Sequence, residues 1–389
     1  MKRIWILLIC ISAVAFGQKR FDVTIESEDR IREAIISVPT TPPPAEGYPI
    51  VFMLHGTSGN AETYYNPVGW KELGQKENFI TIFPSALRWC FYNRFDGRTI
   101  NSRFVCGGLL GEICEDVEQD FVDDILFFKK LIKLVADTVK INPDKIFASG
   151  FSNGSSMTHK LMTHATDVFK VAAGSSSPLH ELDSIVPPRR MPFWYVVGTK
   201  DDRYFSEGHP EELPFEGDTI LAYLYNQLHR ALDCNGLTED YEKVAYPTSI
   251  TYIFNQCKPG EECAPYVFTI NKGQTHQFPN GINYPFDAPK LFWDFFNNPP
   301  KTKISTSTQQ ETLLQLKAYP VPASGSAHIQ LPGHQQFKIL VYDSQGRLLL
   351  QKLNVSNQIE IYTSEIGIGV FFVSAQSQDG VYQAKLVME

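Results

Sequence analysis

The chain has 389 residues, a length that suits two domains. It is 43% hydrophobic and 20% charged, which is typical of globular proteins and excludes wholesale disorder. Its 35 Lys and Arg residues face 43 Asp and Glu residues, for a net charge of -8, and no dense basic run occurs. Because phosphate binding needs clustered cations, the composition argues against a nucleic-acid partner.

The first 17 residues have the pattern of a secretory signal peptide. Lys2 and Arg3 precede a short apolar stretch, and the small residues Ala15 and Gly17 suit a cleavage site before Gln18. The stretch is too short to span a membrane comfortably, and no later run reaches the roughly 20 apolar residues of a transmembrane helix. We therefore expect a secreted protein with no stable membrane span.

Six further cysteines follow the predicted signal peptide. In an exported protein an even set of cysteines predicts disulfides, but the sequence does not choose among the 15 possible pairings of six. Metal-binding spacings such as C-x-x-C and H-E-x-x-H are missing, and no metal or other cofactor is expected. The six are Cys90, Cys106, Cys114, Cys234, Cys257 and Cys263.

Residues 18–297 have the pattern of an α/β domain. Short apolar runs rich in β-branched residues predict strands, and helical or loop segments separate them. Apolar residues recur at helical spacing over 118–140, and 287–297 is typical of a closing amphipathic helix. This alternation predicts a mostly parallel sheet covered by helices on both faces. The predicted strands lie at 21–27, 32–39, 49–56, 78–85, 145–150, 170–176, 192–198, 249–255 and 266–271.

The last part of the chain differs in character from the α/β domain. Residues 298–312 are polar and rich in Thr, Ser and Gln, which predicts a linker. Residues 313–389 contain short apolar runs separated by Gly, Ser and Asp turns, without helical periodicity. We interpret this segment as a small all-β sandwich.

Gly150-Phe151-Ser152-Asn153-Gly154 is a G-x-S-x-G motif between a predicted strand and a predicted helix. In that context a tight turn lifts the serine hydroxyl to the carboxyl end of the sheet, where it can act as a nucleophile. The backbone N–H groups at the start of the helix lie beside the hydroxyl.

A serine nucleophile needs a base and an orienting carboxylate, and hydrolases of this topology order them Ser, Asp or Glu, His. Asp201 and Asp202 follow the strand at 192–198, and spacing alone leaves the choice between them open. His276 follows the strand at 266–271. The sequence thus predicts Ser152 as nucleophile, His276 as base and Asp201 as the preferred carboxylate.

An oxyanion hole needs N–H donors aimed at the charge that develops on the carbonyl oxygen. We expect one donor from the backbone of Asn153, directly after the nucleophile. The other is expected from Thr57, in the loop after the strand at 49–56. Aromatic residues near these motifs in the sequence, Trp89, Tyr64 and Phe278, are candidates for a substrate-binding wall.

The ordered set of motifs resembles the polyhydroxybutyrate depolymerase-like esterases and the related feruloyl and acetylxylan esterases of carbohydrate esterase family one. It consists of LHGTSGN, INPDKIFASGFSNG, VVGTKD and GQTHQFP, and the resemblance covers about 21–297. The resemblance implies an α/β-hydrolase fold and ester hydrolysis through an acyl-enzyme. The G-T-x-D pattern of the family favours Asp201 over Asp202.

The C-terminal segment resembles the sorting domain of type IX secretion substrates. The resemblance rests on YPVP at 319–322, VYDSQG at 341–346 and IGIGVFF at 366–372. It implies the type IX secretion machinery as a partner. An ordinary carbohydrate-binding sandwich is the alternative.

Four functions are compatible with the sequence. The first is hydrolysis of feruloyl or acetyl esters of plant cell-wall polysaccharide, and the second is depolymerisation of a polyester. The third is non-catalytic glycan binding on a hydrolase scaffold. A peptidase would use the same three groups.

Overall fold

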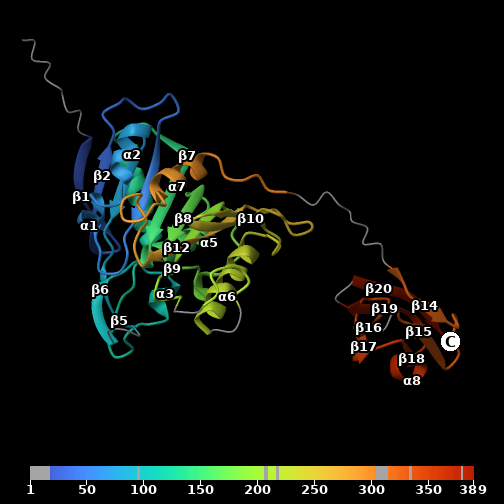
Figure 1. The fold of residues 1–389 in the computed structure, drawn as a ribbon. Coiled ribbons are helices and arrows are strands. Elements are labelled where there is room, and N and C mark those ends of the chain that lie inside the picture. Colours follow the sequence, from blue (N-terminus) through green and yellow to red (C-terminus); the bar gives the residue numbers. More distant parts are fainter. Residues whose placement is uncertain are drawn as a thin grey trace, which may run out of the picture. The chain divides into compact units, whose positions relative to one another are not determined.

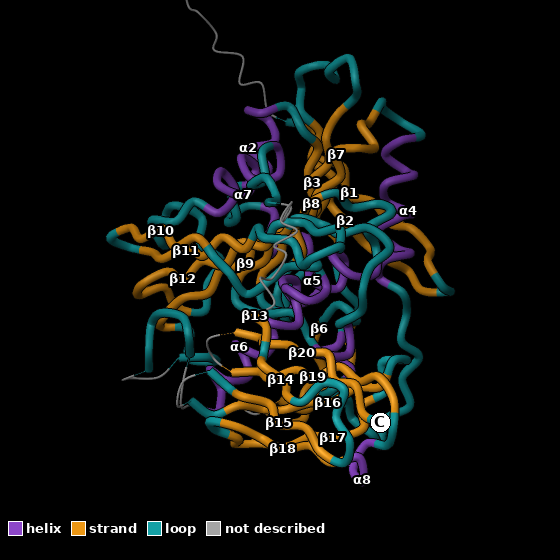
Figure 2. The backbone as a smooth tube through the Cα atoms, turned by 90° about the vertical axis from the view of Figure 1, so that its right-hand side faces the viewer, coloured by secondary structure: helices purple, strands orange, loops and turns teal. Residues whose placement is uncertain are grey.

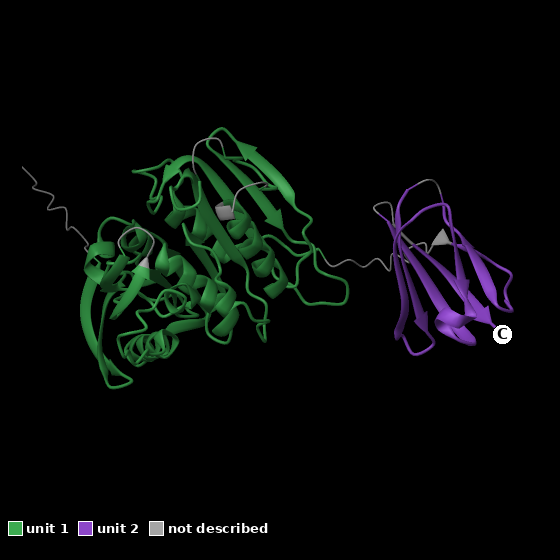
Figure 3. Ribbon diagram, turned by 90° about the horizontal axis from the view of Figure 1, so that it is seen from below, with its two compact units in different colours: residues 1–305 green, residues 306–389 purple. Residues whose placement is uncertain are grey.

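The computed structural model describes residues 18–93, 97–205, 209–215, 219–303, 314–332, 335–377 and 380–389. The chain forms two compact units, residues 1–305 and 306–389 (Figure 3). The predicted signal peptide at 1–17 lies outside the described residues, and so do residues 304–312 of the predicted linker. Within the described residues, no helix combines the length and apolar character needed to cross a bilayer.

The first unit is built around a ten-stranded sheet in the order β1-β2-β4-β3-β7-β8-β9-β12-β11-β10 (Figure 1). The six strands from β4 to β12 in this order pair in parallel, and the strands at both edges pair antiparallel. In chain order the strands are β1 (Lys19–Ser27), β2 (Arg30–Val38), β3 (Tyr48–Leu54), β4 (Ile80–Pro84), β7 (Ile141–Phe151), β8 (Val171–Ser175), β9 (Phe193–Lys200), β10 (Glu242–Tyr246), β11 (Ser249–Phe254) and β12 (Tyr266–Thr275).

Both faces of this sheet are buried. Along β3, Ile50 and Phe52 pack into one core with residues of α4, α5 and α6, whereas Val51 and Met53 pack into a second core with residues of α2 and α7. Figure 2 shows α2 and α7 on one side of β3 and β7, and α4 on the other. Strands buried on both faces read as continuous apolar runs, which is why β3 is apolar throughout.

Short helices complete the first unit. They are α1 (Ala61–Tyr65), α2 (Trp70–Glu77), α3 (Gly107–Leu110), α4 (Asp124–Ala136), α5 (Asn153–His164), the 3₁₀ turn η1 (Glu181–Asp183), α6 (Thr219–Cys234) and α7 (Ala288–Asn297). A hairpin of β5 (Arg88–Asn93) and β6 (Gly97–Ser102) stands apart from the main sheet.

The strand order and the helices on both faces are those of an α/β-hydrolase, so the predicted fold class is confirmed. All nine predicted strands occur, and the three predicted helices correspond to α4, α5 and α7. The β5–β6 hairpin and β10 were not predicted, because their sequences lack a clear period-2 or uninterrupted apolar pattern. The helix α6 was missed although Leu221, Leu224 and Leu228 recur at helical spacing along it.

The second unit is a β-sandwich with its own core, as the sequence predicts. One sheet has the order β13-β20-β19-β16-β17 and the other β14-β15-β18. Its elements are β13 (Leu314–Gln315), β14 (Lys317–Tyr319), β15 (Ser326–Gln330), β16 (Phe337–Asp343), β17 (Leu348–Val355), β18 (Gln358–Tyr362), α8 (Thr363–Ile366), β19 (Gly369–Ser377) and β20 (Gly380–Met388).

Four of the six cysteines form disulfides, Cys90–Cys114 and Cys257–Cys263. The expectation that all six would pair is corrected, because Cys106 and Cys234 are free and buried. These two thiols lie at the start of α3 and the end of α6, enclosed by apolar side chains of one core. Burial raises the pKa of Cys106 to about 12 and that of Cys234 to about 11. Both therefore stay protonated and pack as small apolar groups.

Candidate active site

Ser152 occupies a strained turn between β7 and α5. Its φ of 52° and ψ of -122° are unusual for a residue with a side chain. Its backbone N–H donates to Ser175 O on the neighbouring strand β8 at 2.8 Å. The turn leads directly into α5, and the first hydrogen bond of the helix runs from the Ser155 N–H to Ser152 O at 2.8 Å. The N–H groups of Asn153 and Gly154 precede this bond and lie next to Ser152.

The two motif glycines are required by close backbone packing. A Cβ on Gly150 would lie 2.1 Å from Gly154 O, and one on Gly154 would lie 2.2 Å from Leu54 O. Non-bonded heavy atoms do not approach so closely, so neither position accepts a side chain without displacing backbone. The first turn of α5 can therefore pack directly against the carboxyl ends of β3 and β7.

The structure brings Ser152, His276 and Asp201 together in one hydrogen-bonded chain. His276 Nδ1 lies 2.8 Å from Asp201 Oδ2, and His276 Nε2 lies 3.0 Å from Ser152 Oγ. Because a carboxylate only accepts hydrogen bonds, the imidazole proton is on Nδ1, and Nε2 is left to accept from the serine hydroxyl. This is the geometry of a serine nucleophile with a base and an orienting carboxylate.

The two neighbouring aspartates have opposite environments. The Asp201 side chain is fully buried, and its Oδ1 also accepts from the Arg203 N–H at 3.2 Å. The Asp202 side chain is 79% exposed and pairs with Arg203 at 3.5 Å. The structure thus places Asp201, and not Asp202, beside His276.

The loop after β3 passes close to Ser152. A Cβ on Gly56 would lie 3.2 Å from Ser152 Cβ and 3.1 Å from the Tyr64 hydroxyl. Thr57 follows in this loop, and Thr57 and Asn153 line the same cavity as Ser152. The structure therefore places the two predicted oxyanion-hole residues on the cavity that holds the predicted nucleophile.

The His55 side chain holds the loop after β3 in place through hydrogen bonds. Its Nε2 accepts from the Ala86 N–H at 3.0 Å, so its proton is on Nδ1, which donates to Gly56 O at 2.7 Å. Burial lowers the pKa of His55 to about 4 and keeps the ring neutral. The imidazole holds the backbone that precedes Thr57 and is itself fully buried.

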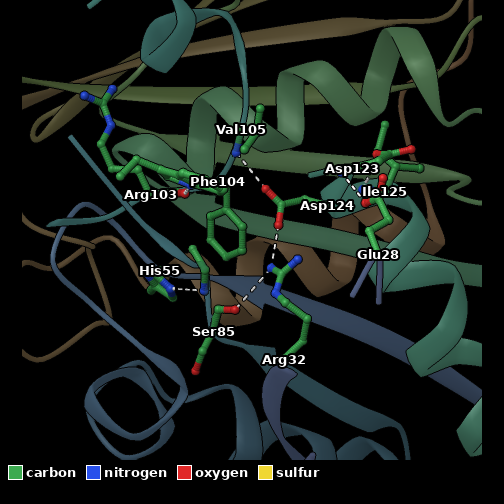
Figure 4. A network of polar contacts seen from close by, with 12 residues as sticks. Glu28, Arg32, His55, Ser85, Arg103, Phe104, Val105, Asp123, Asp124 and Ile125 are labelled. Carbon is green, nitrogen blue, oxygen red and sulfur yellow. Dashed lines mark hydrogen bonds and ion pairs between the residues drawn. The ribbon is translucent and has the colours of Figure 1, made fainter. Parts of the chain in front are cut away.

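A buried ion pair between Arg32 and Asp124 lies near His55 (Figure 4). Arg32 Nη2 donates to Asp124 Oδ1 at 2.6 Å and to Ser85 O at 3.3 Å, and Asp124 Oδ2 accepts from the Val105 N–H at 2.6 Å. The ion pair thus links the chain just after β4, where Ala86 contacts His55, to the segment that begins at Arg103. Removing one partner of such a pair leaves an uncompensated buried charge, which is strongly destabilising.

The Asn153 side chain holds the same segment against the serine turn. Its Oδ1 accepts from the Phe104 N–H at 2.7 Å, and its Nδ2 donates to Phe104 O at 3.2 Å. Asn153 was predicted to contribute only its backbone N–H. Its side chain in addition links the nucleophile turn to the wall of the cavity.

A cavity of about 670 Å³ opens at Ser152. Its size is within the range of small-molecule binding sites. Most of its wall was not predicted from the sequence, because it comes from segments that are distant in the chain. The lining residues are Gly56, Thr57, Tyr64, Phe91, Arg103, Gly108, Gly111, Glu112, Phe151, Ser152, Asn153, Ser156, Ser176, Ser177, Pro178, His180, Arg203, Tyr204, Tyr223 and His276.

Of the three aromatic residues predicted to bind substrate, the structure places Tyr64 at the cavity and the other two in the core. Trp89 is buried against Phe121, with its indole N–H donating to Arg103 O at 3.0 Å. Phe278 is buried in the core beneath α7 and touches Phe151 edge-on. The predictions for Trp89 and Phe278 are therefore corrected, because neither residue lines the cavity and both side chains are buried in apolar clusters.

Three cavity residues that were not predicted lie in the segment between two cysteines that form a disulfide. Phe91, Arg103 and Glu112 lie between Cys90 and Cys114, whose disulfide ties the β5–β6 hairpin to the loop after α3.

Within the described residues, no group of three or more His, Cys, Asp or Glu side chains is arranged to hold a metal ion.

Comparison with protein families identifies the second unit. Residues 317–389 match the model described as the secretion system C-terminal sorting domain. This match confirms the predicted sorting domain and indicates that the protein is exported to the extracellular space or the cell surface.

One curated relative is "Feruloyl esterase B" of Piromyces equi. It is 26% identical over 192 residues, which are 48% of this chain and 32% of the relative, so the alignment spans about a third of that protein.

Two solved structures with a similar backbone are an acetyl xylan esterase from Aspergillus awamori and an S-formylglutathione hydrolase from Agrobacterium tumefaciens. The first is 14% identical with a TM-score of 0.46, and the match covers 72% of this chain and 99% of that one. The second is 12% identical with a TM-score of 0.45, and covers 72% and 95%.

Proposed function

We propose that this protein is a secreted serine esterase that cleaves carboxylic esters through an acyl-enzyme on Ser152. The observation that carries the proposal is the hydrogen-bonded chain from Asp201 through His276 to Ser152, at 2.8 and 3.0 Å. The strained turn that presents Ser152 at the mouth of a cavity supports it further. The C-terminal sorting domain is consistent with an enzyme that acts outside the cell.

In the proposed reaction Ser152 Oγ attacks the ester carbonyl carbon while His276 Nε2 takes the hydroxyl proton. The backbone N–H groups of Thr57 and Asn153 receive the oxyanion. Collapse of the tetrahedral intermediate breaks the bond to the alcohol oxygen, which takes the proton from His276 and leaves. A water molecule, deprotonated by His276, then hydrolyses the acyl-enzyme and regenerates Ser152. Asp201 keeps the imidazole proton on Nδ1 and stabilises the imidazolium that forms.

We further propose feruloyl or acetyl esters of plant cell-wall polysaccharide as substrates. The partial similarity to a protein named a feruloyl esterase supports this class. The cavity also combines aromatic surface from Tyr64, Phe91 and Phe151 with polar groups, which suits an aromatic acid joined to a sugar. Polyester film and a short peptide amide are the contrasting substrates that would assign the protein to a polyester depolymerase or a peptidase.

The decisive experiment combines a fluorophosphonate probe with Ser152→Ala. We expect the wild-type protein to be labelled covalently and to hydrolyse p-nitrophenyl acetate, and S152A to lose both properties with an unchanged thermal unfolding midpoint. Ser58→Ala is the matched control, because Ser58 is exposed in the loop beside the site. A wild-type protein that the probe does not label, and that binds glycans without turnover, would support the non-catalytic alternative instead.

A further inference from the structure

The cavity wall formed by the β5–β6 hairpin and α3 carries an ion pair that the proposed reaction does not use. We propose that Arg103 and Glu112 form a subsite for the hydroxyl groups of a sugar, the alcohol part of the ester that Ser152 cleaves. This inference rests on the proposed function and assigns two residues to the recognition of the sugar alcohol.

Arg103 is held in place with part of its hydrogen-bonding capacity unused. Its Nη1 donates to Glu112 Oε2 at 2.9 Å, and its guanidinium carbon lies 4.2 Å from the centre of the Phe91 ring. The Arg103 side chain is only 10% exposed. Nevertheless Nε is buried without a hydrogen-bond partner, and Nη2 has none among the described residues. Nε is enclosed by the protein, whereas Nη2 is not a buried atom, so Nη2 is the donor that a hydroxyl group in the cavity can reach.

Gly108 leaves room for that ligand close to the nucleophile. A Cβ built on Gly108 would lie 3.8 Å from Arg103 Nη2 and 3.9 Å from Ser156 Oγ, which are its nearest contacts outside its own helix. Ser156 is one helical turn after Ser152 on α5. Arg103 Nη2 therefore borders the same part of the cavity as the first turn of α5.

The charges of the wall favour a neutral polyol over an anion. Glu112 offsets the charge of Arg103 and would repel a substrate carboxylate, and the Glu112 side chain is 45% exposed with acceptor capacity left on Oε1. A guanidinium donor next to a carboxylate acceptor matches two neighbouring sugar hydroxyls, one accepting and one donating. Sites built to bind a substrate hydroxyl discriminate strongly against substrates that lack it.

The test compares two esters with the same acyl group, feruloylated arabinose and methyl ferulate. For Glu112→Gln and Arg103→Gln we expect the ratio of kcat/KM on the sugar ester to kcat/KM on the methyl ester to fall about 10-fold or more, mainly through KM, since a charge-assisted hydrogen bond is lost. Comparing variants on both esters cancels the intrinsic reactivity of each leaving group.

Asp116→Asn is the matched control. Asp116 forms a similar ion pair with Arg98 at 2.7 Å in the same region, outside the cavity lining. We expect D116N to keep the wild-type ratio. If R103Q does not fold, E112Q decides alone, because the Glu112 side chain is partly exposed and its thermal unfolding can be compared directly with that of D116N.

The outcomes separate this inference from the proposed function. If E112Q lowers both activities equally, or leaves the ratio unchanged, the subsite is refuted while the esterase proposal stands. If the wild-type protein hydrolyses neither ester, feruloyl esters are excluded as substrates, and the fluorophosphonate probe and p-nitrophenyl acetate decide the esterase proposal. Calorimetric binding of an arabinoxylan oligosaccharide to S152A, with and without E112Q, then tests the subsite by itself. Oligosaccharide binding that E112Q weakens 10-fold or more supports the subsite, and binding that is absent or unaffected by E112Q overturns it.

Discussion

Replacing Asp201 by asparagine tests the central contact of the site. The Asp201 carboxylate is fully buried and accepts from His276 Nδ1 at 2.8 Å. An asparagine can turn its amide N–H toward Nδ1, which moves the imidazole proton to Nε2 and removes the acceptor for the Ser152 hydroxyl. We expect kcat to fall by about 10⁴-fold, the size of effect seen when a triad carboxylate is replaced in this way. That loss corresponds to about 5 kcal/mol of barrier.

The matched control is Asp202→Asn in the adjacent position. The Asp202 side chain is 79% exposed and touches only the Arg203 guanidinium among the ion pairs of the described residues. We therefore expect D202N to keep kcat within about twofold of wild type, since exposed ion pairs contribute little. Steady-state hydrolysis of p-nitrophenyl acetate measures both variants, and circular dichroism checks their folds. The reasoning is refuted if D201N retains a tenth of the activity or if D202N loses as much as D201N.

Two further predictions concern stability. Gly154→Ala would place a Cβ 2.2 Å from a backbone carbonyl oxygen of β3, so we expect it to destabilise the protein by about 3 kcal/mol or more in urea unfolding. Gly108→Ala, whose nearest contact is 3.8 Å, should stay within about 1 kcal/mol of wild type, and equal losses in the two variants would contradict the packing argument. Burial lowers the pKa of His55 to about 4 and that of His159 to about 3. Both stay neutral in the folded state while the unfolded chain takes up protons below pH 6.5. The free energy of unfolding should therefore be at its full value above pH 6.5 and fall as the pH drops toward 4, by up to about 1.4 kcal/mol per pH unit for each histidine. Urea midpoints that stay constant between pH 7 and pH 5 would disprove this.

The parts of the fold that were predicted from the sequence are those in which local pattern and burial coincide. The strand β3 is apolar at every position because both faces of the sheet are covered, and its flanking turns mark its ends. The β5–β6 hairpin was missed because it packs outside this sheet, where no such continuous pattern is required. The disulfide that ties the hairpin to the loop after α3 joins Cys90 to Cys114, 24 residues away in the chain.

Side-chain environments were harder to predict than backbone elements. Trp89 and Phe278 are close to the motifs in the sequence, but their side chains fill the core, and Arg103 and Glu112 form the cavity wall instead. Aromatic residues fill cores as well as binding sites, so proximity along the chain does not separate the two cases.

The sequence by itself determined the alternation of strands and helices, the glycine-flanked turn at Ser152 and the order Ser, Asp, His along the chain. These features depend on local backbone geometry and hydrophobic periodicity, which a linear pattern records. Only the tertiary structure decided that Asp201 rather than Asp202 meets His276, which cysteines pair, and which residues line the cavity. Each of those outcomes depends on distances and burial between segments far apart in the chain, which arise only when the sheet has formed and the loops at its edge have packed together.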